Sequence, residues 1–157
     1  MSFRAITRSQ AETEDFGFKI GQALKTNLKT ANVCLYGDLG AGKTTLIKGI
    51  ASALGIPKRD VGSASFVIVA EYETSPLFYH IDLYRLERAE DIEDLGIWEY
   101  LEAGGISVIE WAERLPEIPD NAVIVKISYL DEDSREIIIE GIPDSFFEEK
   151  TVTDKGV

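Results

Sequence analysis

Apolar residues recur along the chain with two periods, and these periods predict where helices and strands lie. Over residues 10–29 they return every third or fourth position, which predicts an amphipathic helix. Ser9 and Glu12 have the spacing of a capping box at its start. The same period predicts a helix over residues 44–54 and another over 89–101, the latter with a break at its single glycine.

Short apolar runs between these helices predict strands. Six such runs are present, at residues 32–36, 66–72, 77–82, 106–110, 122–129 and 135–140. The link between the second and third runs is too short for a crossover helix, so that pair should be antiparallel. Alternation of helices and apolar strands predicts a three-layer α/β fold, in which helices flank a mixed, mostly parallel sheet.

Length and composition fit one globular domain. The chain has 157 residues, of which 45% are hydrophobic. We expect a single domain over residues 1–142 and a polar, mobile tail over 143–157. The chain contains no apolar stretch long enough to cross a bilayer, and its N-terminus lacks the apolar core of a signal peptide. The lone Cys34 fits a reducing compartment and a core position, so we expect a cytoplasmic protein.

The net charge narrows the choice of partners. It is −12, from 28 acidic and 16 basic side chains, and a surface that negative repels nucleic-acid phosphates. We therefore expect no tight direct binding of RNA or DNA. The acids are spread along the chain, which leaves open a plainly solvated surface or a surface that meets a basic protein partner.

A glycine-rich segment carries the strongest chemical signal. Gly37, Gly42, Lys43 and Thr44 satisfy the P-loop pattern G-x-x-x-x-G-K-[ST], between a predicted strand and a predicted helix. Glycines allow close backbone approach, and the loop N–H groups and the helix N-terminus attract phosphate. Lys43 would reach the β and γ phosphates, and the Thr44 hydroxyl would ligate Mg²⁺.

The expected ligand is therefore ATP or ADP with Mg²⁺. ATP is favoured over GTP because the chain lacks the guanine-recognising motif Asn-Lys-x-Asp. The loop residues expected to surround the phosphates are Gly37, Asp38, Leu39, Gly40, Ala41, Gly42, Lys43, Thr44 and Thr45.

Two acids are candidates for the metal and for catalysis. Glu110 and Asp82 each end an apolar run, where open α/β sheets place their ligands. The pattern alone does not say which one contacts the metal. His80 alternates with Asp82, so both should face the same side of their strand, with a hydrogen-bonded structural role favoured for the histidine. Trp111 has three open roles, as a core residue, a lid residue or a ligand contact.

Two further residues have competing interpretations. Ser65 lies between the P-loop helix and the predicted hairpin, where many P-loop proteins carry a switch that senses the γ-phosphate. A plain serine-rich turn stays open as the alternative. Arg85 could act as an internal arginine finger, but a surface salt bridge is favoured.

The motifs together resemble a known family. The runs GDLGAGKTT, SASF, YHIDLYRL and IEW, at these spacings in so short a chain, resemble the TsaE (YjeE) family. Its members are small bacterial P-loop ATPases required for threonylcarbamoyl modification of adenosine (t6A) in tRNA. The resemblance covers about residues 5–140 and implies the three-layer P-loop NTPase fold.

The resemblance also implies roles for the candidate residues. Lys43 would bind phosphate and serve catalysis with Asp82, which would lie near the γ-phosphate. Thr44 and Glu110 would hold Mg²⁺. The family usually has Ser-Pro-Thr-Phe or Ser-Pro-Thr-Tyr where this chain has SASF, so the hydroxyl of Ser65 keeps the phosphate-sensing role.

The base and the partners follow from the same resemblance. Gln10 with its neighbours, and the turn from Glu132 to Arg135, are candidates to contact adenine. The implied partners are TsaD and TsaB, whose complex this ATPase would reset after each turnover, without acting on tRNA directly. We expect a monomer that hydrolyses ATP slowly alone, because no convincing arginine finger is present. A small-molecule kinase and a regulatory nucleotide-binding module remain the alternatives, and the former is disfavoured by the few arginines and the lack of an obvious lid.

Overall fold

The computed structural model describes residues 2–28, 30–38, 40–61 and 68–147. The elements in chain order are β1 (Ser2–Thr7), α1 (Gln10–Ala23), the π-helical turn η1 (Leu24–Leu28), β2 (Ala31–Tyr36), α2 (Lys43–Ala53), η2 (Lys58–Asp60), β3 (Val69–Tyr72), β4 (Phe78–Asp82), α3 (Ala89–Asp94), α4 (Ile97–Leu101), β5 (Ile106–Glu110), η3 (Ala112–Arg114), β6 (Val123–Tyr129), β7 (Arg135–Glu140) and η4 (Asp144–Phe146).

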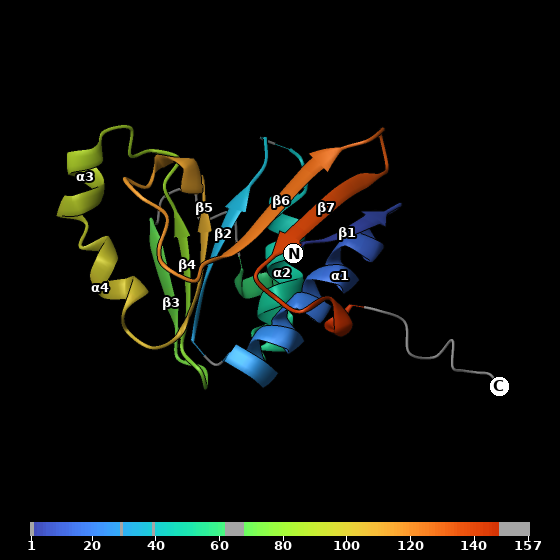
Figure 1. Ribbon diagram of the computed structural model, residues 1–157, viewed down its shortest axis with the longest axis horizontal. Helices are drawn as coiled ribbons and strands as arrows, with labels where there is room; N and C mark the ends of the chain where they lie inside the picture. Colours follow the sequence, from blue (N-terminus) through green and yellow to red (C-terminus); the bar gives the residue numbers. More distant parts are fainter. Residues whose placement is uncertain (1, 29, 39, 62–67, 148–157) are drawn as a thin grey trace.

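One mixed sheet runs through the molecule (Figure 1). Over the described residues it has seven strands in the order β1-β7-β6-β2-β5-β4-β3. The central neighbours β6, β2, β5 and β4 are parallel, whereas β3–β4, β6–β7 and β1–β7 are antiparallel. The mixed sheet and the antiparallel hairpin are confirmed. The expectation of a mostly parallel sheet is wrong, because antiparallel strands occupy both edges and the parallel pairings are confined to the centre.

Strand β1 explains part of that difference. The apolar pattern predicted no strand at residues 2–7, and β1 forms by pairing with β7 in the register Ser2↔Glu140 to Thr7↔Arg135. An edge strand with one neighbour has few local signals, since its pairing depends on residues far along the chain.

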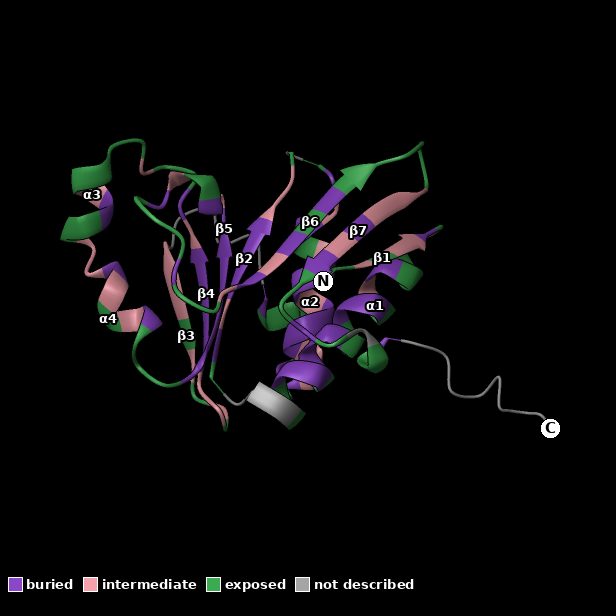
Figure 2. Cartoon of the chain, viewed as in Figure 1, coloured by how far each residue is buried: buried purple, intermediate pink, exposed green. Residues whose placement is uncertain are grey.

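Two hydrophobic clusters lie on opposite faces of the sheet and make the fold three-layered (Figures 1 and 2). Helices α1 and α2 pack on one face, and α3 and α4 pack on the other. Strand β2 serves both clusters by alternation: Val33 and Leu35 face α1 and α2, while Cys34 joins the opposite cluster. Cys34 is fully buried, which confirms its predicted core position, and this burial raises the pKa of its thiol to about 11.

Close contact between α1 and α2 fixes the helix that follows the glycine loop. A Cβ at Gly49 would lie 2.1 Å from the Glu14 carbonyl oxygen, and one at Gly17 would lie 2.3 Å from the Leu46 carbonyl oxygen. Glycine is therefore required where the two backbones meet. The side chain of Ser9 accepts from the Glu12 amide at 3.0 Å, as the predicted cap requires.

The remaining predicted boundaries are largely confirmed. The break in the third predicted helix occurs at Gly96, whose φ of 77° separates α3 from α4. The described structure continues past residue 142 to Phe147, whose ring packs 5.1 Å from Phe3 and 5.4 Å from Phe16. The mobile tail was predicted from residue 143; its part from residue 148 onward lies outside the described residues, so mobility there stays a prediction. None of the described helices has the length and apolar character needed to cross a membrane.

Candidate functional site

The glycine loop, residues 37–42, joins the end of β2 to the start of α2, as the sequence predicted. Gly40 and Gly42 have φ of 78° and 108°, backbone angles that disfavour any side chain. Gly37 approaches β6 so closely that a Cβ would lie 2.8 Å from the Ile127 carbonyl oxygen. The strand, loop and helix are thus arranged as a phosphate-binding loop requires. Leu39 lies outside the described residues.

Lys43, the first residue of α2, holds a buried cation. Its side chain is 6% exposed, and Nζ has no hydrogen-bond partner in the described part of the chain. The ammonium lies over the face of Trp111, with Nζ 4.2 Å from the ring centroid. An ammonium removed from water without an acceptor is costly, so this position favours an anionic ligand.

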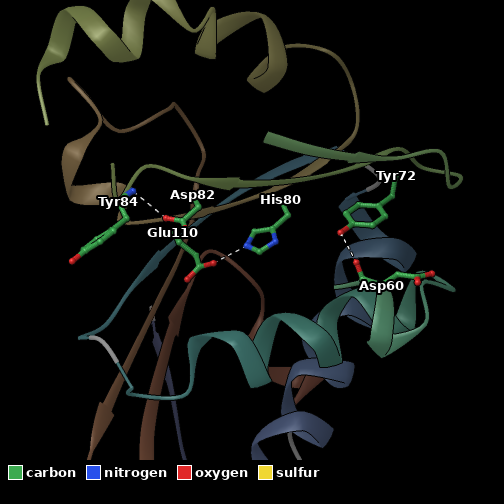
Figure 3. A network of polar contacts seen from close by, with 6 residues as sticks. All are labelled: Asp60, Tyr72, His80, Asp82, Tyr84 and Glu110. Atoms are coloured by element: carbon green, nitrogen blue, oxygen red, sulfur yellow. Dashed lines mark hydrogen bonds and ion pairs between the residues drawn. The ribbon is translucent and has the colours of Figure 1, made fainter. Parts of the chain in front are cut away.

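Two carboxylates end adjacent strands beside this lysine. Asp82 of β4 and Glu110 of β5 are direct register partners. His80 Nε2 lies 2.6 Å from Glu110 Oε2, both side chains are buried, and both point toward α2 (Figure 3). The structural, hydrogen-bonded role predicted for His80 is confirmed, and its partner is the candidate metal ligand.

Asp82 is electrostatically coupled to the rest of this group. Burial raises the pKa of Asp82, and the negative charge of Glu110 adds to the increase. A hydrogen bond from the Tyr84 amide to Asp82 Oδ1, at 3.0 Å, and the charges of His80 and Lys43 act in the opposite direction. The net direction is upward, so the anionic form of this carboxyl is less favourable than that of a surface aspartate.

Trp111 and two neighbours form an aromatic and cationic cover next to Lys43. Trp111 has a φ of 59°, which turns the chain sharply after β5. The exposed Tyr84 packs with its ring 5.0 Å from that of Trp111. The Arg114 guanidinium lies 5.6 Å from the Trp111 ring and donates to the Leu86 carbonyl at 3.3 Å. The sequence left the role of Trp111 open and gave no signal for Tyr84 or Arg114.

A cleft of about 320 Å³ opens on the other side of the glycine loop. It brings together Gln10 at the start of α1 and Glu132 in the β6–β7 turn, two residues far apart in sequence. The full lining comprises Ser9, Gln10, Thr13, Gly40, Gly42, Thr45, Glu132, Asp133 and Arg135. The two predicted base-contact candidates thus share one cleft with the loop. Ser9, next to Gln10, and Asp133, in the turn, belong to the two predicted segments, whereas Thr13 was not predicted to contribute.

Two more of the predicted site residues lie on the surface. Thr44 is exposed on the first turn of α2, and Asp38 is exposed after β2. Ser65 lies outside the described residues, so its phosphate-sensing role stays a prediction. In the described ranges no three His, Cys, Asp or Glu side chains converge as a metal cluster. Magnesium in phosphate sites needs only one or two protein ligands, since phosphates and water supply the others.

Comparisons with known proteins place the chain in a family. Residues 7–137 match the family described as "Threonylcarbamoyl adenosine biosynthesis protein TsaE". A protein of Treponema pallidum named tRNA threonylcarbamoyladenosine biosynthesis protein TsaE is 36% identical over 137 residues, covering 87% of this chain and 98% of that protein. A protein of the same name from Aquifex aeolicus is 38% identical over 131 residues, covering 82% and 91%.

A solved structure has the same fold. The crystal structure of Bacillus subtilus YdiB matches with a TM-score of 0.68 and 30% identity, covering 94% of this chain and 90% of that chain. The family match and the relatives extend over the glycine loop, both strand-end acids and Trp111. The chain belongs to the TsaE family.

Proposed function

We propose that this chain is an ATPase that binds ATP with Mg²⁺ at the glycine loop and serves t6A modification of tRNA. The observation that carries the proposal is the buried Lys43 ammonium, which lacks an acceptor among the described residues and stands beside two strand-end carboxylates. A triphosphate would supply the missing acceptors. The names of the relatives supply the pathway, tRNA threonylcarbamoyladenosine biosynthesis.

The phosphates would lie over the N-terminus of α2. The loop N–H groups and the helix dipole would bind them, and Lys43 would leave the Trp111 face to contact the β and γ phosphates. Thr44 and Glu110 would hold Mg²⁺, which supplies charge neutralisation of the phosphate oxygens when bound. His80 hydrogen-bonds Glu110 Oε2, which would leave the other oxygen of that carboxylate to ligate the cation.

Asp82 would support hydrolysis. It lies within electrostatic reach of Lys43 and Glu110, and the Tyr84 amide fixes one of its oxygens. A carboxylate with a raised pKa is suited to orient the attacking water and to accept its proton. Ser65 would sense the γ-phosphate from the segment before β3.

The cleft beside the loop would hold the nucleobase. Gln10 and Glu132 approach it from α1 and from the β6–β7 turn. Their amide and carboxylate groups can respectively donate to and accept from the edge of a purine. Adenine is favoured because the chain has no Asn-Lys-x-Asp sequence for guanine.

The partners would be TsaD and TsaB, and the chain would be cytoplasmic and monomeric on its own. A net charge of −12 suits docking on protein better than binding tRNA. Slow turnover alone would follow from the lack of a convincing arginine finger in the sequence. Arg114 is stacked near Trp111 and Tyr84 and is tied to the Leu86 carbonyl. A partner could supply the missing cation and increase turnover by roughly 10³-fold or more.

A product assay with the reconstituted system tests the proposal. The chain is mixed with ATP and Mg²⁺, with and without TsaD and TsaB, and the release of ADP and phosphate and the formation of t6A on tRNA are measured. Lys43→Ala should abolish both activities, while Lys48→Ala, further along the same helix, should leave both intact. A folded Lys43→Ala variant with full activity would refute the site, and a phosphorylated acceptor in place of free phosphate would indicate a kinase.

A further inference from the structure

Arg135, the first residue of β7, connects the β6–β7 turn to the glycine loop. The Arg135 Nε donates to the Ala41 carbonyl at 2.9 Å. Its Nη1 donates to three carbonyls of the turn, those of Asp131 and Glu132 at 3.3 Å and Ser134 at 3.1 Å. One guanidinium thus ties the loop to the turn that lines the adjacent cleft.

Tyr129 adds a second contact to the same loop. The guanidinium of Arg135 lies 4.3 Å from the Tyr129 ring centroid, a stacked cation–π arrangement. The Tyr129 hydroxyl donates to the Gly40 carbonyl at 2.5 Å. Two consecutive carbonyls of the loop, Gly40 and Ala41, are therefore held by a stacked pair of side chains.

The direction of those carbonyls decides where the loop N–H groups point. Because a peptide unit is planar, fixing the Ala41 C=O also fixes the N–H of Gly42, which points the opposite way. The Gly40 C=O shares its peptide unit with the Ala41 N–H, which donates to Asp38 at 3.0 Å and closes the loop. A phosphate loop needs its N–H groups turned inward, so its carbonyls need partners on the outside.

We propose that Arg135, supported by Tyr129, is a positioning residue that presets the glycine loop for phosphate and connects it to the base cleft. Arg135 contacts the outer carbonyl side of the loop, and its role differs from the base contact expected of the 132–135 turn. The identity of the ligand rests on the proposed nucleotide function, whereas the contacts of Arg135 with the glycine loop are present without nucleotide.

The turn also has hydrogen bonds that do not involve Arg135. Asp131 Oδ1 accepts the amides of Asp133 at 3.0 Å and Ser134 at 2.8 Å. These bonds hold the pKa of Asp131 below its usual value. Arg135 therefore joins the glycine loop to a turn that has hydrogen bonds of its own, and its loss should loosen the loop more than the turn.

Affinity for two ligands separates this role from base recognition. ATP and inorganic tripolyphosphate, each with Mg²⁺, are titrated into wild type, Arg135→Ala, Arg135→Lys and Tyr129→Phe. Arg135→Ala should weaken both ligands equally, by roughly 10–100-fold for one lost charged hydrogen bond. Tyr129→Phe should weaken both by about 3–10-fold for a neutral one. Glu132→Ala is the matched control, because Arg135 contacts only the backbone of that residue, and it should leave tripolyphosphate affinity unchanged.

The lysine variant separates positioning from direct phosphate attraction. A lysine side chain at this position would keep the charge but lacks the planar fork that reaches the loop and the turn together, so Arg135→Lys should bind as weakly as Arg135→Ala. Full rescue by lysine, or loss of ATP affinity without loss of tripolyphosphate affinity, would overturn the proposal.

Hydrogen exchange of the free chain decides the point independently. Arg135→Ala should accelerate amide exchange at Ala41, whose N–H donates to the Asp38 carbonyl, about tenfold or more, while the β5 amides remain unchanged. Unchanged exchange in the loop would overturn the positioning role. If wild type failed to bind ATP at all, the proposed function would fail, and this exchange measurement would still test the inference.

Discussion

Replacing Lys43 by methionine should move stability and nucleotide binding in opposite directions. Methionine keeps the length and apolar stem of lysine but removes the charge. In the free chain the Nζ atom is buried, has no acceptor in the described structure, and lies at the positive end of a helix. Each of these features makes the charge a cost when no nucleotide is bound.

The magnitude follows from the contacts. Removing an unsatisfied buried polar group gains about 1–3 kcal/mol, and removing a cation from a helix N-terminus gains about 0.3–1 kcal/mol. The cation–π contact with Trp111 is lost, at up to about 2 kcal/mol, but a sulfur–aromatic contact restores about 0.3–1.5 kcal/mol. The attraction between Lys43 and Asp82 is also lost and offsets part of this gain. The net gain is about 1 kcal/mol, which raises the melting temperature by roughly 2–4 °C in a chain of this size.

Binding of ATP with Mg²⁺ should make wild type more stable than Lys43→Met. The lost contacts to phosphate are worth about 1.5–3 kcal/mol each, so two would weaken ATP binding by roughly 10² to 10⁴-fold. Wild type in ATP at a hundred times its Kd gains about 2.7 kcal/mol, which methionine cannot match. Urea denaturation with and without ATP and Mg²⁺ measures both effects, with Lys48→Met as the control. A free Lys43→Met variant less stable than wild type by more than about 1 kcal/mol would refute the argument.

Four further outcomes are expected. Glu110→Ala should lose mainly the magnesium-dependent part of ATP affinity, and Asp82→Ala should lose mainly turnover. Calorimetry with and without Mg²⁺ measures the first effect, and a phosphate-release assay measures the second. Reversed phenotypes would exchange the two roles. Asp82→Asn should stabilise the free chain at neutral pH. Because the folded-state pKa of Asp82 is raised, the carboxyl contributes stability below its unfolded-state pKa, and this contribution is lost as pH rises through the folded-state pKa. The stability advantage of asparagine should therefore grow with pH above about 4 in a series of denaturation curves. Gly49→Ala should cost about 1–3 kcal/mol or more in unfolding free energy, since its Cβ would meet the backbone of α1 at 2.1 Å, whereas Gly55→Ala, with open space around it, reports only the backbone strain of a positive φ. Activation by TsaD and TsaB should fall across a salt series, because the Debye length shrinks to about 3 Å at 1 M and screens the −12 charge; salt-independent activation would argue against charge-guided docking.

The predictable parts of the site are those that depend on residues close together in the sequence. The glycine loop is local, so its position between β2 and α2 followed from the motif and the periodicity around it. The facing of His80 followed from alternation along β4, and Asp82 and Glu110 followed from where their strands end. None of these inferences needed knowledge of contacts between distant segments.

The parts that were missed depend on such contacts. Arg135 reaches Ala41 across 94 positions, and Tyr129 reaches Gly40 across 89. Neither pair lies in a motif, and both depend on the turn chemistry and register of β6 and β7. The strand β1 and the surplus of antiparallel pairing were missed for the same reason, because strand order is decided by packing of both faces at once.

The nucleotide-free site contains two charged groups, the carboxyl of Asp82 and the ammonium of Lys43, that each lower the free energy of unfolding. The carboxyl of Asp82 has a raised pKa because it is buried near Glu110, and the ammonium of Lys43 is buried without an acceptor in the described residues. Each reduces the stability of the free chain, yet neither neutralises the other through a hydrogen bond that the structure contains. A phosphate chain with its Mg²⁺ would supply the missing partner for both, since it presents anionic oxygens to the lysine and a cation to the carboxylates. The stability gained on binding should therefore exceed what surface burial of the nucleotide alone provides, and it should shrink when either Lys43 or Asp82 is replaced by a neutral residue of similar size.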